Sequence, residues 1–528
     1  MLRESVVRRG ILTAASFLVL IMLVGCQGLV KAPTPTPSPT PTPTPAPPLP
    51  PPATLQTSIN HIVVMAQENR SFDSYFGTMH QFWAQNGFKD QPWDGLPQFN
   101  TPAGAAPSLP GCDPTLPFNP PLQTNDCKPD PLHPVQSFHL VTKCVENPSP
   151  SWNESHNDWN LTNPIDPIAT NDGFVWTAGH DARQIVPPFL DTNGLRAMGY
   201  YDGNDLNYYH FMASSFATSD RWFSPVMSRT DPNRMYLLAA TSQGHVYPLG
   251  HSVPAAPPLS AMTIFQELQQ AGITWRIYVH PDPQPRNGCT ANDVTPACLF
   301  NQAYIKNFTY GKTILSQFPQ NIVPTDQFIT DAKNGTLPQV ALIEPASGAG
   351  LDEHPSDVDP LPGQPPCCSV QGGAAYVSTL INALMTGPNW KDSAFIFTFD
   401  EAGGFYDHVA PQPAVSPDGI PPSDLGPLDI CAIKKGPNCD FVYTGYRVPM
   451  FVASPFAKKN FVSHTVADYT AILKLIETRF KLPALTKRDA AQIDMSKEFF
   501  DFAHPAWTTP PTPPAQNRDG ICYVDHLP

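Results

Sequence analysis

The segment that decides the fold is Phe395-Ile-Phe-Thr-Phe-Asp-Glu-Ala-Gly-Gly-Phe-Tyr-Asp-His-Val409. Its first five residues are aromatic or β-branched on both faces, which predicts a strand buried inside a sheet. The run ends in Asp400 and Glu401, followed by two glycines. Ligands of open α/β sheets bind outside the carboxyl ends of the strands, so the acid pair predicts a hard cation or an acid/base couple. A helix N-cap followed by a solvated acid is the alternative interpretation.

A second apolar run ends in the same way. Residues 59–66 predict another buried strand, and Glu68 and Asn69 follow it closely. A carboxylate and an amide carbonyl suit a hard or borderline cation. Taken alone, the start of a helix would explain this pair. Together with Asp400 and Glu401, the pair favours a metal site at one edge of the sheet.

A hydroxyl at a helix start gives a candidate nucleophile. Residues 230–240 predict a helix with Thr230 as N-cap and Pro232 in its first turn. A helix N-terminus offers unpaired N–H groups and the positive end of the dipole, which favour phosphate. A nearby cation would lower the pKa of the Thr230 hydroxyl so that it could attack. A plain capping role is the alternative.

The other segments fit ordinary α/β construction. His354 follows the short apolar run 340–343 and could protonate a leaving group, although acid-His-Pro loops are also common on surfaces. Residues 91–134 are rich in Pro, Gly, Asn and Asp and predict a long excursion without regular structure. Further strands are expected at 274–279 and 448–453, and helices at 205–213, 263–271, 375–385 and 465–480.

Composition excludes some classes of function. The chain has 528 residues and a formal net charge of −14, without a cluster of Lys and Arg. Electrostatic binding of nucleic acid needs a basic surface, so no nucleic-acid partner is expected. With 66 prolines and only 14 % charged residues, the composition favours a loop-rich exported protein.

The N-terminus predicts export. Three arginines precede the apolar run 11–24, which is short for a membrane span and typical of a signal peptide. The sequence Leu23-Val-Gly-Cys26 resembles a bacterial lipoprotein cleavage box, which implies that Cys26 is lipidated and anchors the chain to a membrane at the cell surface. An ordinary cleaved signal is the alternative. Residues 33–52 alternate Pro with Thr, Ser and Ala, which favours an extended stalk.

These patterns predict four parts of the chain: a signal peptide over 1–25, a Pro/Thr-rich linker over 26–57, a catalytic domain over 58–505 and a tail over 506–528.

The cysteines favour disulfides over a metal cluster. Without Cys26, ten of the 11 cysteines remain, an even number in a chain expected to be exported. Three close pairs could each clip a loop: Cys112 with Cys127, Cys289 with Cys298, and Cys431 with Cys439. The pairing of Cys144, Cys367, Cys368 and Cys522 stays open. Zinc held by cysteine is not expected, because the sequence has no C-x-x-C pair.

Four motifs in one order point to a family. Glu68-Asn-Arg-Ser-Phe-Asp73, Thr230-x-Pro-Asn-Arg234, Asp352-Glu-His-Pro355 and Asp400-Glu-x-Gly-Gly-Phe-Tyr-Asp-His408 resemble the bacterial phosphoesterases that include phosphatidylcholine-type phospholipases C and certain respiratory-burst-inhibiting acid phosphatases. The resemblance covers about residues 58–502. It implies an alkaline-phosphatase-like α/β fold, a three-layer sandwich of a mostly parallel sheet between helices, with the site at the carboxyl edge.

The resemblance also implies roles for individual residues. Glu68, Asn69, Asp400 and Glu401 would bind one divalent metal ion, with Zn, Ca, Mg and Mn all open, and Thr230 would be the nucleophile on it. His354 would lie at the phosphoryl oxygens, and His139 is a less well-aligned second site histidine. Asp231 departs from the family pattern, which implies a less anionic or less bulky ligand next to the nucleophile.

The implied function is metal-dependent hydrolysis of phosphate esters through a phosphothreonine intermediate. A phospholipase C acting on phospholipid headgroups is the preferred interpretation, because an anchor at Cys26 would place the site near lipid. An acid phosphatase acting on small soluble monoesters is the first alternative. A catalytically silent surface protein that only binds ligands is the second.

Overall fold

The computed structural model describes residues 53–118, 125–250, 256–357, 368–523 and 527. They belong to one compact unit, Pro52–Pro528. The predicted signal peptide, lipidated Cys26 and Pro/Thr-rich stalk fall on residues 1–52, outside the described residues. Among the helices that the structure describes, none has both the length and the apolar character needed to cross a membrane.

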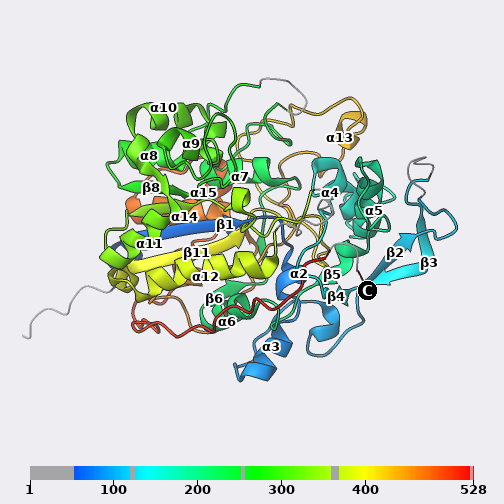
Figure 1. Ribbon diagram of the computed structural model, residues 1–528, viewed down its shortest axis with the longest axis horizontal. Helices are drawn as coiled ribbons and strands as arrows, with labels where there is room; N and C mark the ends of the chain where they lie inside the picture. The colour runs from blue at the N-terminus through cyan, green and yellow to red at the C-terminus, as the bar shows by residue number, and fades with distance from the viewer. Residues whose placement is uncertain (1–52, 119–124, 251–255, 358–367, 524–526, 528) are drawn as a thin grey trace, which may run out of the picture. The chain divides into compact units, whose positions relative to one another are not determined.

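A sheet of eight strands forms the centre of the described unit (Figure 1). The strands stand in the order β13-β6-β12-β11-β1-β10-β8-β9. Of these strands, β12 alone runs antiparallel to its neighbours. The parallel strands therefore end at a common carboxyl edge. The bounds are β1 (His61–Gln67), β6 (Ala217–Ser219), β8 (Trp275–Val279), β9 (Ile322–Pro324), β10 (Val340–Ile343), β11 (Ser393–Phe399), β12 (Met450–Ala453) and β13 (Phe461–Ser463).

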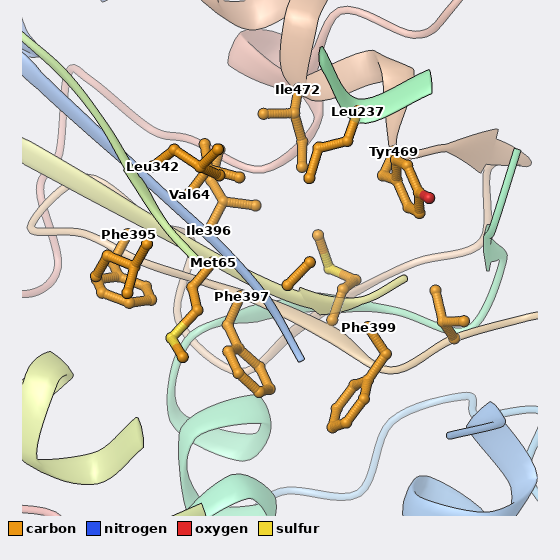
Figure 2. Close-up of a cluster of buried hydrophobic side chains, with 14 of the residues drawn as sticks. Val64, Met65, Leu237, Leu342, Phe395, Ile396, Phe397, Phe399, Tyr469 and Ile472 are labelled. Atoms are coloured by element: carbon orange, nitrogen blue, oxygen red, sulfur yellow. The ribbon is translucent and has the colours of Figure 1, made fainter. Parts of the chain in front are cut away.

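Both faces of the sheet are apolar and covered by helices. Figure 2 shows labelled side chains of β1 and β11 on alternate faces, Val64 and Ile396 on one and Met65 and Phe397 on the other, as the two-residue period of a strand requires. On one face, Val64 lies beneath Leu237 and Ile472, which come from α7 (Thr230–Ala239) and α14 (Thr470–Phe480). These contacts make the first outer layer of the fold.

The opposite face packs on aromatic side chains. The ring of Phe397 lies 4.8 Å from that of Tyr209 in α6 (Asn207–Ser215). Phe395 lies 6.4 Å from Phe328 in α11 (Thr325–Asn334), and α11 in turn contacts α12 (Val370–Thr386). The predicted α/β sandwich, a mostly parallel sheet between two layers of helices, is confirmed.

Shorter elements surround this framework. The remaining helices are α1 (Leu55–Ser58), α2 (Phe72–Phe76), α3 (Met79–Asn86), α4 (Trp152–Trp159), α5 (Phe174–Gln184), α8 (Ile264–Gln270), α9 (Pro296–Phe300), α10 (Thr309–Gln317), α13 (Ile430–Ile433), α15 (Lys487–Ala490) and α16 (Met495–Glu498). Three small ladders pair β2 (Ser108–Cys112) with β3 (Pro129–Gln136), β4 (Phe138–His139) with β5 (Gly199–Tyr200), and β7 (Trp222–Phe223) with β14 (Ala467–Asp468).

Two expectations about local structure are corrected. The excursion at 91–134 is not without regular structure, because β2 and β3 pair within it across a register shift at Pro110 and Gly111. Its prolines hid the strand pattern from sequence reasoning. The helix expected at 465–480 begins only at Thr470, since residues 467–468 pair with β7 instead.

Four disulfides are present among the described residues. The three predicted pairs form: Cys112–Cys127, Cys289–Cys298 and Cys431–Cys439. The fourth joins Cys144 to Cys522, at a sequence separation of 378, and ties the C-terminal segment to the body. Cys367 lies outside the described residues.

Candidate active site

The polar ends of β1 and β11 meet at the carboxyl edge of the sheet. Gln67 and Phe399, the last residues of these neighbouring strands, are register partners. Glu68 and Asn69 follow the first strand, and Asp400 and Glu401 follow the second. The Oδ1 atom of Asp400 accepts hydrogen bonds from the backbone N–H groups of Asn69, at 3.1 Å, and Glu401, at 2.8 Å. The structure thus brings together the four residues that the sequence singled out as metal ligands.

Two left-handed residues shape the turns at this edge. Asn69 has φ 65° and Gly403 has φ 73°. Asparagine is one of the few residues with a side chain that enters this region at moderate cost, and glycine enters it freely. A Cβ on Gly403 would lie 2.3 Å from the carbonyl oxygen of Asn69, so the two turns are in close backbone contact.

Thr230 faces this cluster from the start of α7. Its predicted N-cap role is wrong: Arg229 occupies the N-cap, and Thr230 is the first residue of the ten-residue helix. The hydroxyl is therefore not used for capping. It donates instead to Oδ1 of Asn69 at 3.2 Å, and the residue is only partly buried. The hydroxyl is accessible, and it lies where the helix dipole favours an anion.

Arg234, one turn further along α7, supplies a buried positive charge. Its Nε lies 3.3 Å from Asp400, and its Nη2 lies 3.6 Å from Glu68. The same guanidinium donates to the carbonyls of Ala66 at 2.9 Å and Gln67 at 3.1 Å, which fixes its orientation. Arg234 belongs to the Thr230 motif, but sequence reasoning gave it no role.

Burial and mutual repulsion both oppose the ionisation of the carboxyl groups in this cluster. Burial raises the pKa values of Glu68, Asp400 and Glu401, and repulsion from neighbouring carboxylates raises those of Glu68 and Glu401 further. Arg234 opposes the rise for Glu68 and Asp400. Within the described residues, Oε1 of Glu401 is buried and has no hydrogen-bond partner. Three acidic side chains, one of them with this unpartnered oxygen, and the Asn69 amide form a donor set that fits a hard divalent cation.

His354 lies beside this cluster. The backbone N–H of Glu68 donates to the carbonyl of Asp352 at 3.0 Å, which holds the two loops together. His354 is close enough to Asp400 that a protonated ring lowers the pKa of that carboxyl. Its Nδ1 contacts the carbonyl oxygen of Pro355, which can only accept, so Nδ1 carries the proton and Nε2 remains for other contacts.

His139 has a different environment. Its Nε2 lies 2.6 Å from Asp205, and Lys143 lies 2.5 Å from the other oxygen of that carboxylate. The Asp205 carboxylate raises the pKa of His139. Among the described residues, His139 contacts Asp205 and Tyr200 and is not seen to contact Glu68, Thr230 or Asp400. Its role in the site stays a prediction.

Three groups of His, Cys, Asp and Glu among the described residues hold their possible ligand atoms within 4.8 Å of one another, and the Glu68 cluster is not one of them. The groups are His156 with Cys431 and Cys439, Asp73 with Asp407 and His408, and His139 with Asp202 and Asp205. The two cysteines form a disulfide and offer no thiolate. The second group already holds a guanidinium, and Lys143 bonds a carboxylate of the third. The Glu68 cluster is the better candidate for a metal site.

Comparison with known proteins identifies the family. The profile of the phosphoesterase family matches residues 59–483. The chain belongs to the phosphoesterase family. It is 30 % identical over 489 residues to phospholipase C B of Mycobacterium tuberculosis, covering 88 % of this chain and 80 % of that one. It is 29 % identical to non-specific phospholipase C4 of Arabidopsis thaliana, covering 82 % and 70 %.

Among solved structures, a protein of the alkaline phosphatase superfamily from Vibrio parahaemolyticus is 12 % identical and covers 54 % of this chain and 63 % of that one, with a TM-score of 0.30. The family and the curated relatives show that this phosphoesterase is a hydrolase acting on phosphoester bonds.

Sequence reasoning missed a second buried network in this phosphoesterase. Arg447 donates to Asp407 at 2.6 Å and to Asp73 at 3.0 Å. His408 lies 2.7 Å from the other oxygen of Asp73. Asp73 lies in the segment after β1 and Asp407 in the segment after β11. The network, called the clamp below, therefore ties these two segments together. Three of its members lie inside the quoted motifs, but the position of Arg447 carried no signal in the sequence.

A segment remote in sequence also supports the site. Tyr304 donates its hydroxyl to Glu68 at 2.6 Å, and its ring lies 5.0 Å from the Arg234 guanidinium. Asn307 donates to Asp231 at 2.9 Å. Asp231, the departure from the family pattern, is thus held by a side-chain amide next to the nucleophile.

Proposed function

We propose that this phosphoesterase is a metal-dependent phospholipase C that cleaves phospholipid headgroups through a phosphothreonine intermediate. The observation that carries the proposal is the hydrogen bond from Thr230 to Asn69 at the edge where Glu68, Asp400 and Glu401 converge. A hydroxyl at a helix N-terminus, facing buried carboxylates, has the composition of a metal-activated nucleophile site. The relatives named phospholipase C support the choice of substrate.

Glu68, Asn69, Asp400 and Glu401 would hold one divalent ion together with the Thr230 oxygen. When bound, such an ion neutralises charge on phosphoryl oxygens and lowers the pKa of a coordinated hydroxyl. The donor set consists of oxygens, which suits Mg²⁺, Ca²⁺ or Mn²⁺ and is compatible with Zn²⁺.

In the proposed reaction, Thr230 and His354 take part directly in making and breaking bonds. The Thr230 hydroxyl releases its proton to solvent, its Oγ1 attacks phosphorus, and the bond from phosphorus to the diacylglycerol oxygen breaks. His354, in its imidazolium form, gives its Nε2 proton to the departing alkoxide, a type of step that contributes about 10²- to 10⁴-fold. Water then hydrolyses the phosphothreonine, which regenerates the Thr230 hydroxyl and releases the phosphorylated headgroup. The positive end of α7 stabilises the negative charge of the bound phosphoryl group.

The test compares the wild-type protein with Thr230→Ala and Thr230→Ser, each with and without chelator. The substrates are a chromogenic phosphate monoester and phosphatidylcholine vesicles. We expect chelator-sensitive release of diacylglycerol, its loss in Thr230→Ala with the fold retained, and partial activity in Thr230→Ser. A phosphorylated Thr230 trapped by acid quench and found by mass spectrometry would support the covalent step.

Other outcomes have clear meanings. Cleavage of the monoester alone would make the protein a phosphatase. Silence on both substrates with metal bound would indicate a binding protein. Normal turnover by a folded Thr230→Ala variant would overturn the nucleophile assignment.

We also propose that the protein is exported and anchored to a membrane through lipidated Cys26. The support is the sequence pattern at residues 1–26. Radiolabelled fatty acid incorporated by the wild-type chain and not by Cys26→Ser would test it.

A further inference from the structure

The loop over residues 426–439 contains α13 (Figure 1) and exposes large apolar side chains. Leu428 is 86 % exposed and Ile433 is 69 % exposed. Ile168, in a neighbouring segment, is 70 % exposed. Large aliphatic side chains that project together from one region of a soluble surface mark an interaction site.

The 426–439 loop is held firmly in this position. Cys431 and Cys439 close it with a disulfide. The Asp429 carboxylate accepts from Asn153 at 2.8 Å and from Tyr247 at 3.1 Å. A Cβ on Gly436 would lie 2.5 Å from Cβ of Ile165, so the loop packs closely on the segment that carries Ile168. The disulfide, the hydrogen bonds of Asp429 and the packing of Gly436 therefore hold Leu428 and Ile433 in their exposed positions.

The charge around these side chains favours an anionic surface. Lys434 and Lys435 follow Ile433 directly, and both are exposed. Asp424 and Asp429 accept hydrogen bonds from backbone and side-chain groups, whereas Asp440, directly after the loop, is exposed, so the exposed lysines outnumber the exposed acids two to one over residues 424–440. Adjacent aliphatic and basic side chains are the pattern of segments that lie in a membrane interface, with the apolar part inserted and the lysines at the headgroups.

The loop is connected to the nucleophile segment. Asp424, just before the loop, accepts from the backbone N–H of Val246 at 3.0 Å. The carbonyl of Val246 accepts from the hydroxyl of Ser228, two residues before Thr230. Two hydrogen bonds therefore link the base of the exposed loop to the segment that begins α7.

We propose that the 426–439 loop docks this phosphoesterase on phospholipid bilayers that contain anionic lipid, with Leu428 and Ile433 inserted and Lys434 and Lys435 on the headgroups. The inference rests on the proposed phospholipase function and adds the surface by which the site meets its substrate.

The test is co-sedimentation with vesicles of phosphatidylcholine and phosphatidylserine in equal parts. Protein beginning at Pro52 removes the segment predicted to carry a lipid and keeps every described strand and disulfide, and the full chain is tested beside it. The Thr230→Ala background prevents hydrolysis. We expect Leu428→Asp to weaken vesicle binding about tenfold, from the lost burial of one aliphatic side chain. Lys434→Gln with Lys435→Gln should weaken it about thirtyfold, or about fivefold for each lysine.

The matched control is Leu132→Asp, because Leu132 is 84 % exposed but lies in β3. It should leave vesicle binding unchanged. Equal binding by the loop variants and their parent, or an equal loss in the Leu132 control, would overturn the proposal. Hydrolysis of a soluble chromogenic ester, measured with Thr230 restored, should be the same in all variants. Failure of the parent with Thr230 restored to cleave either this ester or phosphatidylcholine would refute the proposed function, while the vesicle result would still decide the docking surface.

Discussion

Gly403→Ala should disable the site through the backbone alone. Gly403 has φ 73°, and an added Cβ would lie 2.3 Å from the carbonyl oxygen of Asn69, whereas ordinary contacts begin at 3.4 Å. The Asn69 turn must therefore move by about 1 Å to admit the methyl group. That turn holds Asn69 against Asp400 through its N–H and against Thr230 through its side chain.

Two costs follow from this displacement. A left-handed alanine costs about 1–2 kcal/mol of stability. A misplacement of about 1 Å in a catalytic group can lower turnover about 10²-fold. We therefore expect a modest loss of stability and a far larger loss of activity.

The control separates the two costs. Gly272 has φ 70°, and no described atom lies within 4 Å of the Cβ that an alanine would place there. Gly272→Ala should show the stability cost without loss of turnover. The assays are urea denaturation and chelator-sensitive hydrolysis of a soluble phosphate ester at saturating metal. If Gly403→Ala turns over substrate as fast as Gly272→Ala, the close contact does not position Asn69 and the reasoning fails.

Three further predictions concern buried charges. Arg234→Met should lower the free energy of unfolding by about 3–5 kcal/mol in urea, because it leaves carboxylates buried without their cation; an unchanged midpoint would count against this pairing. Chelation should lower the thermal midpoint more as the pH rises above 4.5, because the raised pKa values of Glu68 and Glu401 make their ionisation destabilising in the fold; parallel pH profiles with and without metal would contradict it. Burial, with Asp489 adding to it, raises the pKa of Glu477 to about 10, so the wild type loses stability as the pH rises from 4.5 towards 10. Glu477→Gln should flatten that loss and be the more stable protein in alkaline buffer, and identical thermal profiles would refute it.

The sequence predicted those parts of the fold that have a clear pattern over neighbouring residues. β1 and β11 carry apolar residues at consecutive positions, whereas a half-buried strand alternates apolar and polar residues. Their place in the middle of the sheet could therefore be inferred. Close cysteine pairs similarly predicted three disulfides. By contrast, β6 and β13 have three residues each, too few for a period to show. The reversed direction of β12 leaves no mark in its composition.

The candidate site was predictable where its residues follow strands. Glu68 and Asp400 stand at the same edge because parallel strands end together, which a single sequence can suggest. The orientation of Thr230 could not be inferred, because an N-cap and a first helical residue differ by one position in the chain. Tyr304 was missed for another reason. Its hydroxyl reaches Glu68 from 236 residues away, and only the folded chain brings the two together.

The balance of charge distinguishes the two buried networks of the site and gives them different roles. In the clamp, Asp73 and Asp407 face Arg447 and His408, whose pKa the acids raise to about 9, and His408 also contacts Asp94, which pairs with Arg221. Each of these acids therefore has a cationic partner. In the Glu68 cluster, Arg234 is paired with both Glu68 and Asp400, and the charge of Asp352 adds to the repulsion on Glu68. Arg229 attracts Glu401 and His354 attracts Asp400, yet the pKa values of both acids stay above their ordinary values. A neutral network can be buried permanently and serves structure. A buried network whose carboxylates outnumber the cations paired with them is stable only with protons or an added cation, a condition that a divalent metal ion would meet.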